Sequence, residues 1–141
     1  MLKGIDPLLT GSLLKILDEM GHGDVLGLVD RNFPAYRYGV PVIDLRGADT
    51  EAATRAILSV FPLDGFVDAP VRRMEIDGEP DTVTDATTAL GRLAAELDGS
   101  ESAIQSVERF DFYEQAKGAT AFVHTGETIP YSCYLLQKGV V

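Results

Sequence analysis

The sequence is short of the residues that most often build cross-links and metal centres. It has one cysteine, Cys133, and two histidines 102 positions apart, so an internal disulfide is excluded and the close ligand spacings of zinc sites are missing. A single thiol is typical of a reducing cytoplasm, where we expect the chain to reside. No apolar run approaches the roughly 20 residues that span a bilayer, and residues 1–7 lack the apolar region of a signal peptide. We expect no metal, no cofactor and no membrane partner.

Positive charge is also scarce. The chain has 12 lysines and arginines against 22 aspartates and glutamates, which gives a net charge of −10 and a pI near 4.5. Such a surface repels the phosphates of nucleic acids and anionic lipids, so we expect neither as a partner. The basic pair Arg72-Arg73 alternates with apolar residues and is interpreted as a solvated strand face. This charge balance favours a neutral ligand.

What remains is the composition of a globular protein. The 141 residues are 45% hydrophobic and 24% charged, and a domain of this length buries roughly 70% of the surface of its unfolded chain. The sequence has no internal repeat and no linker that divides it. Residues 1–141 are therefore expected to form a single domain.

Predicted helices and strands alternate along the chain, which is typical of an α/β fold. Apolar residues at helical spacing predict helices over 12–20, 50–61, 84–97 and 112–117. Apolar runs predict strands over 25–29, 40–45, 71–76, 104–109, 120–124 and 131–137, the last two flanking a turn over 125–130. Pro41 favours an edge or strand-start position in the second strand. We expect a layered domain with a mixed sheet flanked by helices.

The loop between the first helix and the first strand carries a glycine-flanked histidine, Gly21-His22-Gly23-Asp24. Imidazole gains and loses a proton near neutral pH, and glycine permits close approach of backbone and ligand. A solvated loop histidine explains the pattern equally well. Gly21 suits the left-handed residue after the helix, and Asp24 either orients the imidazole or simply begins the strand.

Asp30 ends the first predicted strand, and ligands of α/β sheets collect beyond the carboxyl ends of strands. We expect this carboxylate to lie close to whatever the His22 loop binds. The alternative is an aspartate that accepts hydrogen bonds from the backbone amides that follow it.

Two residues in the last third of the chain extend this candidate site. Arg109 is expected at the end of a strand, where its fixed fork of donors suits neighbouring hydroxyl groups of a ligand; a salt bridge with Glu108 or Asp111 is the alternative. The Tyr131 hydroxyl can pass a proton, or its ring can belong to an interface. His124 lies among small and apolar residues and is interpreted as structural.

Five blocks of the sequence, in register, resemble the signature of the L-fucose mutarotase / D-ribose pyranase family. They cover residues 21–24, 30–35, 109–114, 125–127 with Tyr131, and 138–140. The resemblance runs over the whole chain, and residues 33–35 and 112–114 favour its fucose branch. It implies an α/β subunit in a ring-like homo-oligomer, commonly a decamer, with sugar pockets at subunit boundaries that the neighbour helps to build.

The resemblance also assigns roles to individual residues. The position of the proton donor is His22, and the sugar-binding positions are Asp30, Arg109 and residues 131–133. The last block departs from the family, which usually has Tyr-Gly-Asn where this chain has Tyr131-Ser132-Cys133. Because a thiol hydrogen-bonds weakly compared with an amide, this departure bears on which sugar is bound. Ser132 is expected to contribute through its backbone.

The implied activity is that of a cofactor-independent isomerase, which interconverts the α and β anomers of a monosaccharide by opening and closing its ring. The reaction delivers one proton to the ring oxygen and takes another from the anomeric hydroxyl. We expect His22 to handle one proton and Tyr131 or a water the other, while Asp30 and Arg109 hold hydroxyls. The alternatives are a ribose-type pyranase, a non-catalytic sugar-binding or regulatory protein, and a structural ring with a vestigial pocket.

Overall fold

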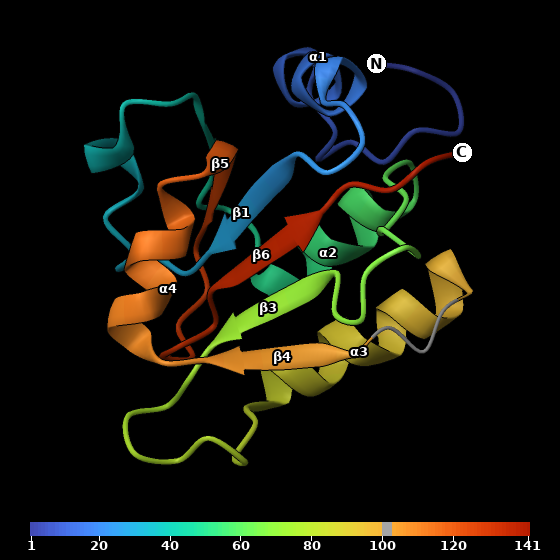
Figure 1. Ribbon diagram of the computed structural model, residues 1–141. Coiled ribbons are helices and arrows are strands. Elements are labelled where there is room, and N and C mark those ends of the chain that lie inside the picture. The colour runs from blue at the N-terminus through green and yellow to red at the C-terminus, as the bar shows by residue number, and fades with distance from the viewer. Residues whose placement is uncertain (100–102) are drawn as a thin grey trace.

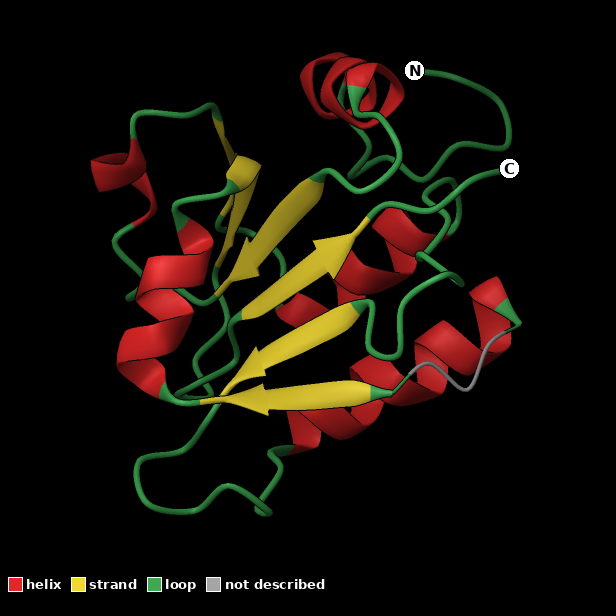
Figure 2. Cartoon of the chain, in the orientation of Figure 1, coloured by secondary structure: helices red, strands yellow, loops and turns green. Residues whose placement is uncertain are grey.

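The computed structural model describes residues 1–99 and 103–141, and within them six strands form one mixed sheet in the order β2-β5-β1-β6-β3-β4. The strands are β1 (Val25–Val29), β2 (Val42–Leu45), β3 (Val71–Met74), β4 (Ile104–Val107), β5 (Ala119–Thr125) and β6 (Tyr134–Gln137). The helices are α1 (Gly11–Glu19), α2 (Thr50–Leu58), α3 (Asp85–Asp98) and α4 (Arg109–Ala116), with a short 3-10 helix, η1 (Ala35–Tyr38). Figure 2 shows the helices on both sides of the sheet. The predicted α/β architecture with a mixed sheet is confirmed.

The two faces of the sheet have separate apolar cores. Side chains of α1, α2 and α3, such as Leu13, Ile57 and Leu90, pack on one face. On the other face, α4 and the segment around η1 enclose a second core that includes Phe112 and Phe122, and α4 lies in front of the sheet in Figure 1. β1 is buried on both faces, as its continuous apolar run predicts. β2 is an edge strand, as Pro41 predicts.

β6 runs against the other five strands. It is antiparallel to β1 and β3, whereas β1 and β2 are parallel to β5 and β3 is parallel to β4. The carboxyl ends of five strands and the start of β6 therefore share one end of the sheet, which we call the carboxyl end. The opposite amino end holds α1 and both chain termini (Figure 1).

Three boundaries at the carboxyl end differ from the predicted ones. Arg109 begins α4 instead of ending β4, because the Glu108 carboxylate caps the helix by accepting the N–H groups of Phe110 at 2.8 Å and Asp111 at 3.2 Å. β6 begins at Tyr134 because Tyr131 has a left-handed backbone, φ 62°, which interrupts an extended chain. Residues 125–130 do not form a hairpin turn, since β1 lies between β5 and β6.

Four smaller expectations are also wrong. Gly21 is not left-handed; Gly23 takes that conformation, with φ 88°. The apolar faces predicted for the helices over 50–61 and 84–97 include Val60 and Leu97, but both residues are exposed, and α2 ends at Leu58. The pair Arg72-Arg73 is not a solvated face, because Arg73 is buried and its guanidinium donates to the carbonyl of Pro80.

None of the described helices is long and apolar enough to cross a membrane.

Candidate functional site

The carboxyl end of the sheet carries a pocket of about 230 Å³. Because β6 runs backwards, the segment before it reaches the same place as the residues that follow β1 and β4. The lining residues are Asp30, Asn32, Phe33, Met74, Arg109, Tyr113, Pro130, Tyr131 and Cys133. Four residues that the sequence singles out for ligand binding, Asp30, Arg109, Tyr131 and Cys133, thus meet in one cavity.

Asp30 is held in place by the turn that follows β1. It is buried, and its Oδ1 accepts the backbone N–H groups of Asn32 at 3.0 Å and Phe33 at 3.1 Å. Asp30 therefore accepts hydrogen bonds from the backbone amides that follow it, as the alternative interpretation predicts, and it also lines the pocket. Oδ2 is the atom left for the neighbouring thiol or a ligand.

Arg109 reaches the pocket from the first turn of α4. Its Nε donates to Asp77 Oδ1 at 3.0 Å, and its guanidinium lies 4.5 Å from the centre of the Phe110 ring. The hydrogen bond with Asp77 raises the pKa of Arg109, so the charge is fixed. The partner is thus Asp77, not Glu108 or Asp111 as the alternative had it.

The segment before β6 divides its side chains between the two faces of the sheet. Cys133 is almost fully buried in the pocket wall, where burial and then the Asp30 carboxylate raise the pKa of the thiol well above its usual value. Ser132 is also buried, and its hydroxyl has no hydrogen-bond partner among the described residues. The hydroxyl of Tyr134, two residues on, lies 2.9 Å from the Thr87 hydroxyl in the α3 layer. The residues that line the pocket do not include Ser132.

His22 lies at the other end of the molecule. The loop that carries it is fixed at the amino end, where the Gly23 N–H donates to the Lys138 carbonyl at 2.8 Å and Asp24 Oδ2 accepts the Gly21 N–H at 2.8 Å. His22 and Asp30 therefore do not adjoin within one chain. All five residues of β1 lie between them, a span of about 16 Å at 3.3 Å per residue.

The partner of His22 is Asp64, which sequence reasoning missed. His22 Nε2 lies 3.1 Å from Asp64 Oδ2, and the same oxygen accepts Gln137 Nε2 at 2.9 Å. The N–H of Phe66, followed by His22 and Gln137, lowers the pKa of Asp64 although burial opposes the shift. The His22–Asp64 contact joins residues 42 positions apart, so no local spacing announces it.

Close backbone packing holds Asp64 in its place. The Asp64 N–H donates to the Gln137 carbonyl at 3.1 Å, and the Gly139 N–H donates to the Pro62 carbonyl at 2.9 Å. A Cβ atom added at Gly139 would overlap the backbone of residues 63–64. Glycine is thus required here for the end of β6 to fix the loop that contacts His22.

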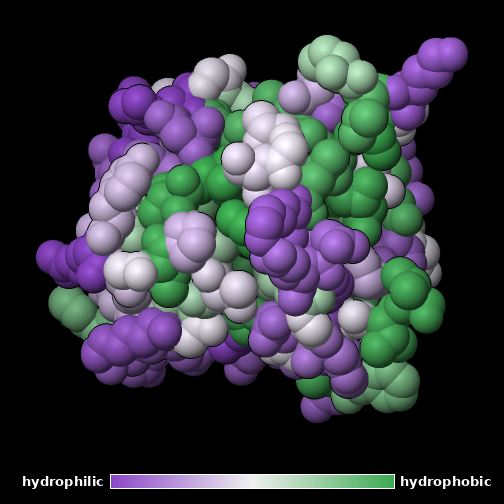
Figure 3. All heavy atoms as spheres, turned by 90° about the horizontal axis from the view of Figure 1, so that it is seen from above, coloured by the Kyte–Doolittle hydropathy of each residue, from purple (hydrophilic) through white to green (hydrophobic). Residues whose placement is uncertain are grey.

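His22 opens onto an apolar groove of about 560 Å³ between α1 and the C-terminal residues. Besides His22, the groove is lined by Leu14, Leu17, Asp18, Met20, Val60, Pro62 and residues 138–141. The His22 ring is 48% exposed, and Phe66, 77% exposed, lies 5.6 Å from it. Seen from above, hydrophobic residues gather in separate areas of this face, with hydrophilic residues between them (Figure 3). An exposed apolar surface of this kind marks an interaction site.

The sequence model of the RbsD / FucU transport protein family matches residues 3–141. The chain belongs to this family. It is 40% identical to a protein of Actinobacillus pleuropneumoniae serotype 5b named L-fucose mutarotase, over 99% of this chain and 97% of that one. The resemblance seen in the sequence is thereby confirmed.

Solved structures of the RbsD / FucU family share this fold closely. FucU from Bifidobacterium longum is 42% identical with a TM-score of 0.91, over 99% of each chain. The fucose mutarotase of Streptococcus pneumoniae, solved in complex with L-fucose, is 34% identical with a TM-score of 0.90, again over 99% of each chain. The mixed sheet and the arrangement of helices described above are therefore those of FucU proteins.

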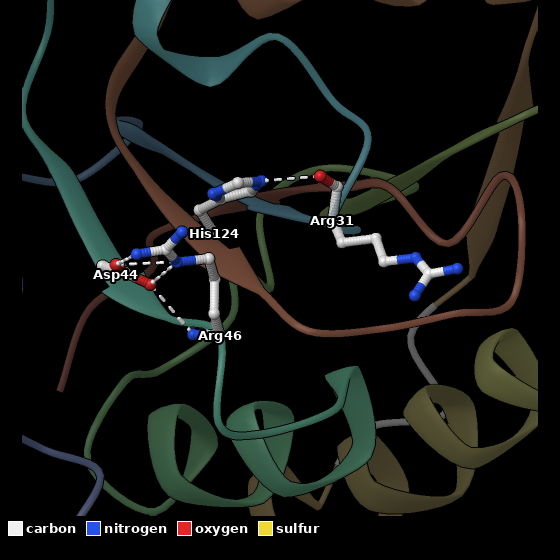
Figure 4. Close-up of polar contacts among 4 residues, drawn as sticks. All are labelled: Arg31, Asp44, Arg46 and His124. Atoms are coloured by element: carbon white, nitrogen blue, oxygen red, sulfur yellow. Dashed lines mark hydrogen bonds and ion pairs between the residues drawn. The ribbon is translucent and has the colours of Figure 1, made fainter.

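His124 does not line the pocket. The ring of His124 packs edge-on against Tyr36, and its Nε2 lies 3.2 Å from the Arg31 carbonyl. Figure 4 shows the Arg31 guanidinium pointing away from this ring, while Arg46 pairs with Asp44 on the neighbouring strand. This surrounding fits the structural interpretation of His124.

Glu127 orders the loop that leads to the pocket. Its carboxylate accepts hydrogen bonds from Thr50 Oγ1 at 2.8 Å and from the N–H groups of Thr128 at 2.8 Å and Ile129 at 2.9 Å. Burial alone would raise the pKa of Glu127, but these bonds outweigh it and lower the pKa. The residue joins the start of α2 to the segment before Tyr131.

Among the residues that the structure describes, no cluster of three potential metal ligands exists.

Proposed function

We propose that this chain is a mutarotase that interconverts the α and β anomers of L-fucose or a related aldose. The observation that carries the proposal is the small pocket in which the polar side chains of Asp30, Arg109 and Tyr131 converge. Relatives that share the fold over nearly the full length are named for fucose mutarotation, and one of them was solved with L-fucose. The sugar is neutral, which suits a chain with a net charge of −10.

The chemistry requires two proton transfers and no net change in charge. The His22 imidazolium donates a proton to the ring oxygen while the bond from C1 to that oxygen breaks. The proton of the anomeric hydroxyl leaves to a water, either directly or through the Tyr131 hydroxyl, which passes its own proton to that water as it receives the new one, and an open-chain aldehyde results. Rotation about the C1–C2 bond and reversal of both transfers close the ring as the other anomer. Asp30 Oδ2 accepts hydrogen bonds from sugar hydroxyls and the guanidinium of Arg109 donates to them.

A complete site of this kind needs two copies of the chain. His22 lies at the amino end of the sheet and the pocket at the carboxyl end, so one copy supplies the histidine and its neighbour the pocket. Contacts between two different surfaces are heterologous, and they close into a ring when the rotation permits. The apolar groove beside His22 supports such a contact. We propose a ring-like homo-oligomer, a decamer as in the fucose branch, located in the cytoplasm.

The activity is tested by saturation-transfer NMR of L-fucose, D-ribose and other aldoses, which measures anomer exchange directly. We expect acceleration by the wild-type protein and a loss of about 10²–10⁴-fold in His22→Ala, the usual contribution of a positioned acid. His124→Ala removes the other histidine and is expected to keep the rate. Exchange that the wild-type protein leaves unchanged in every sugar contradicts the proposal.

The shared site is tested by mixing two inactive variants. His22→Ala keeps its pocket, and Arg109→Ala keeps its histidine. In mixed oligomers each site takes its two halves independently, so roughly a quarter of the sites regain both wild-type halves. Activity recovered after joint unfolding and refolding supports a site built by two copies. No recovery, with mixed oligomers shown by native mass spectrometry, excludes it.

A second function has one observation in its favour. Cys133, which replaces the asparagine usual in the family, faces the pocket as a buried neutral thiol. A pocket that lacks this amide fits a non-catalytic sugar-binding protein. Binding of L-fucose without accelerated exchange would select this alternative.

A further inference from the structure

The carboxylate of Asp64 is a fixed, buried acceptor next to His22. Its side chain is 2% exposed, so it does not reach a sugar itself. Oδ1 accepts the Phe66 N–H at 3.0 Å, and Oδ2 faces Gln137 Nε2 at 2.9 Å and His22 Nε2 at 3.1 Å. All three groups around the carboxylate are nitrogen donors in this arrangement.

We infer that Asp64 is a positioning residue that fixes the tautomer of His22, so that Nδ1 is the nitrogen that exchanges protons with the sugar. This inference rests on the proposed function, in which His22 is the acid. The carboxylate of Asp64 has a lowered pKa and is ionised at neutral pH, so it only accepts. The hydrogen between the two groups therefore belongs to Nε2, and the lone pair of the neutral ring is on Nδ1.

The surroundings of the ring leave Nδ1 accessible. Within residues 1–99 and 103–141, Nδ1 makes no hydrogen bond, and the ring is half exposed toward the groove. The ring of Phe66 stands beside the imidazole at 5.6 Å with an interplanar angle of 56°. Asp64 and Phe66 thus contact the imidazole, and the hydrogen bond to Asp64 is made through Nε2.

This tautomer determines which imidazole hydrogen takes part in the reaction. The imidazolium carries hydrogens on both nitrogens, and the one on Nδ1 passes to the sugar ring oxygen as the C1–O bond breaks. The hydrogen on Nε2 stays in its bond to Asp64. Ring closure returns a proton to Nδ1, so Asp64 neither gains nor loses one.

The tautomer is measured in the wild-type protein by ¹⁵N NMR of the imidazole nitrogens, at a pH where the ring is neutral. His124→Gln removes the second histidine and assigns the spectrum. We expect a pyrrole-type Nε2 and a pyridine-type Nδ1 in His22. A pyrrole-type Nδ1 overturns the inference. The measurement needs no activity, so it stands even if the wild-type protein accelerates no sugar, which would instead overturn the proposed function.

The kinetic consequence is tested with Asp64→Asn and a matched control, Asp44→Asn. The control makes the same change at an exposed carboxylate that pairs with Arg46 and lines neither the groove beside His22 nor the pocket. We expect Asp64→Asn to lower kcat by about 10–100-fold, as loss of an orienting partner does elsewhere, with little change in KM and with a mixed tautomer in the spectrum. Asp44→Asn is expected to keep both the tautomer and the rate. An Asp64→Asn protein with wild-type kcat, including one in which only KM is raised, contradicts the inference.

Discussion

Cys133 lines the pocket at a position where the resemblance to the family implies an asparagine. Burial keeps the thiol neutral, and a neutral thiol offers a sugar hydroxyl only weak hydrogen bonds. An amide at this position adds one good donor and one good acceptor beside Asp30.

We predict that Cys133→Asn binds L-fucose more tightly than the wild-type protein. One added hydrogen bond contributes about 0.5–1.5 kcal/mol, which corresponds to a dissociation constant roughly two- to tenfold lower. Isothermal titration calorimetry measures it, and Cys133→Ala, which removes the thiol without adding an amide, is expected to bind like wild type. Equal affinities of all three proteins would show that this position does not read the sugar.

The same buried thiol is expected to be chemically inert in the native protein. Alkylation requires the thiolate, and the raised pKa leaves little of it at neutral pH. We predict slow modification by iodoacetamide at pH 7 in buffer and rapid modification in denaturant, followed by mass spectrometry. Rapid labelling of the folded protein would contradict the burial of Cys133.

At the scale of elements, Glu127 connects the start of α2 with the loop before Tyr131. Glu127→Gln keeps the size of the side chain but loses the charge and one acceptor oxygen. We predict a lower free energy of unfolding by about 2 kcal/mol at pH 7, the usual contribution of hydrogen bonds to a charged group. Urea denaturation measures this difference, and Glu114→Gln, on an exposed part of α4, is the control.

The pH dependence of this effect has a definite sign. Because the pKa of Glu127 is lowered in the folded chain, its contribution is complete above the pKa of an unfolded glutamate, about 4.3. It is lost as the pH falls through the lower folded-state value. The stability difference between wild type and Glu127→Gln should therefore shrink below about pH 4. A difference that stays constant down to pH 3 would contradict the role of the ionised carboxylate.

Elements with local signals were predicted well, and contacts between distant segments were not. Thr84 and Gly99 delimit α3 as helix caps, and the apolar run of β1 lies where the sequence indicates. The place of β6 between β1 and β3 depends on pairing between segments far apart, which no local pattern encodes. The same holds for the site. Residues of the pocket were named from the sequence, whereas Asp64, which lies 42 positions from His22, was missed.

At the scale of the whole molecule, the two halves of the candidate site face opposite ends of one chain. We predict that activity per chain falls on dilution together with the mass of the particles, because a dissociated chain keeps its fold but not a complete site. Anomer exchange and mass photometry at matched concentrations test this. Full activity in particles of monomer mass would show that one chain suffices.

The net negative charge of each copy also affects the association of copies into oligomers. Each copy has a net charge of −10, so association brings like charges together, and salt screens them beyond a Debye length of about 8 Å at physiological ionic strength. The concentration at which particles dissociate is therefore expected to fall as sodium chloride is raised from low ionic strength to physiological values. Dissociation at a higher protein concentration in salt would indicate that attraction between charges, instead of apolar contact, holds the copies together.

The antiparallel direction of β6 determines how variants in this strand should behave when they are combined with other variants. This strand of four residues has the pocket segment 131–133 at its start and Gln137, next to Asp64, at its end. In the proposed ring the two ends serve two different active sites, one on each side of the subunit. A disruptive substitution at Leu135, in the middle of the strand, would then damage both. In mixed oligomers, variants of His22 and Arg109 would restore each other's activity. The Leu135 variant would be restored by neither of them.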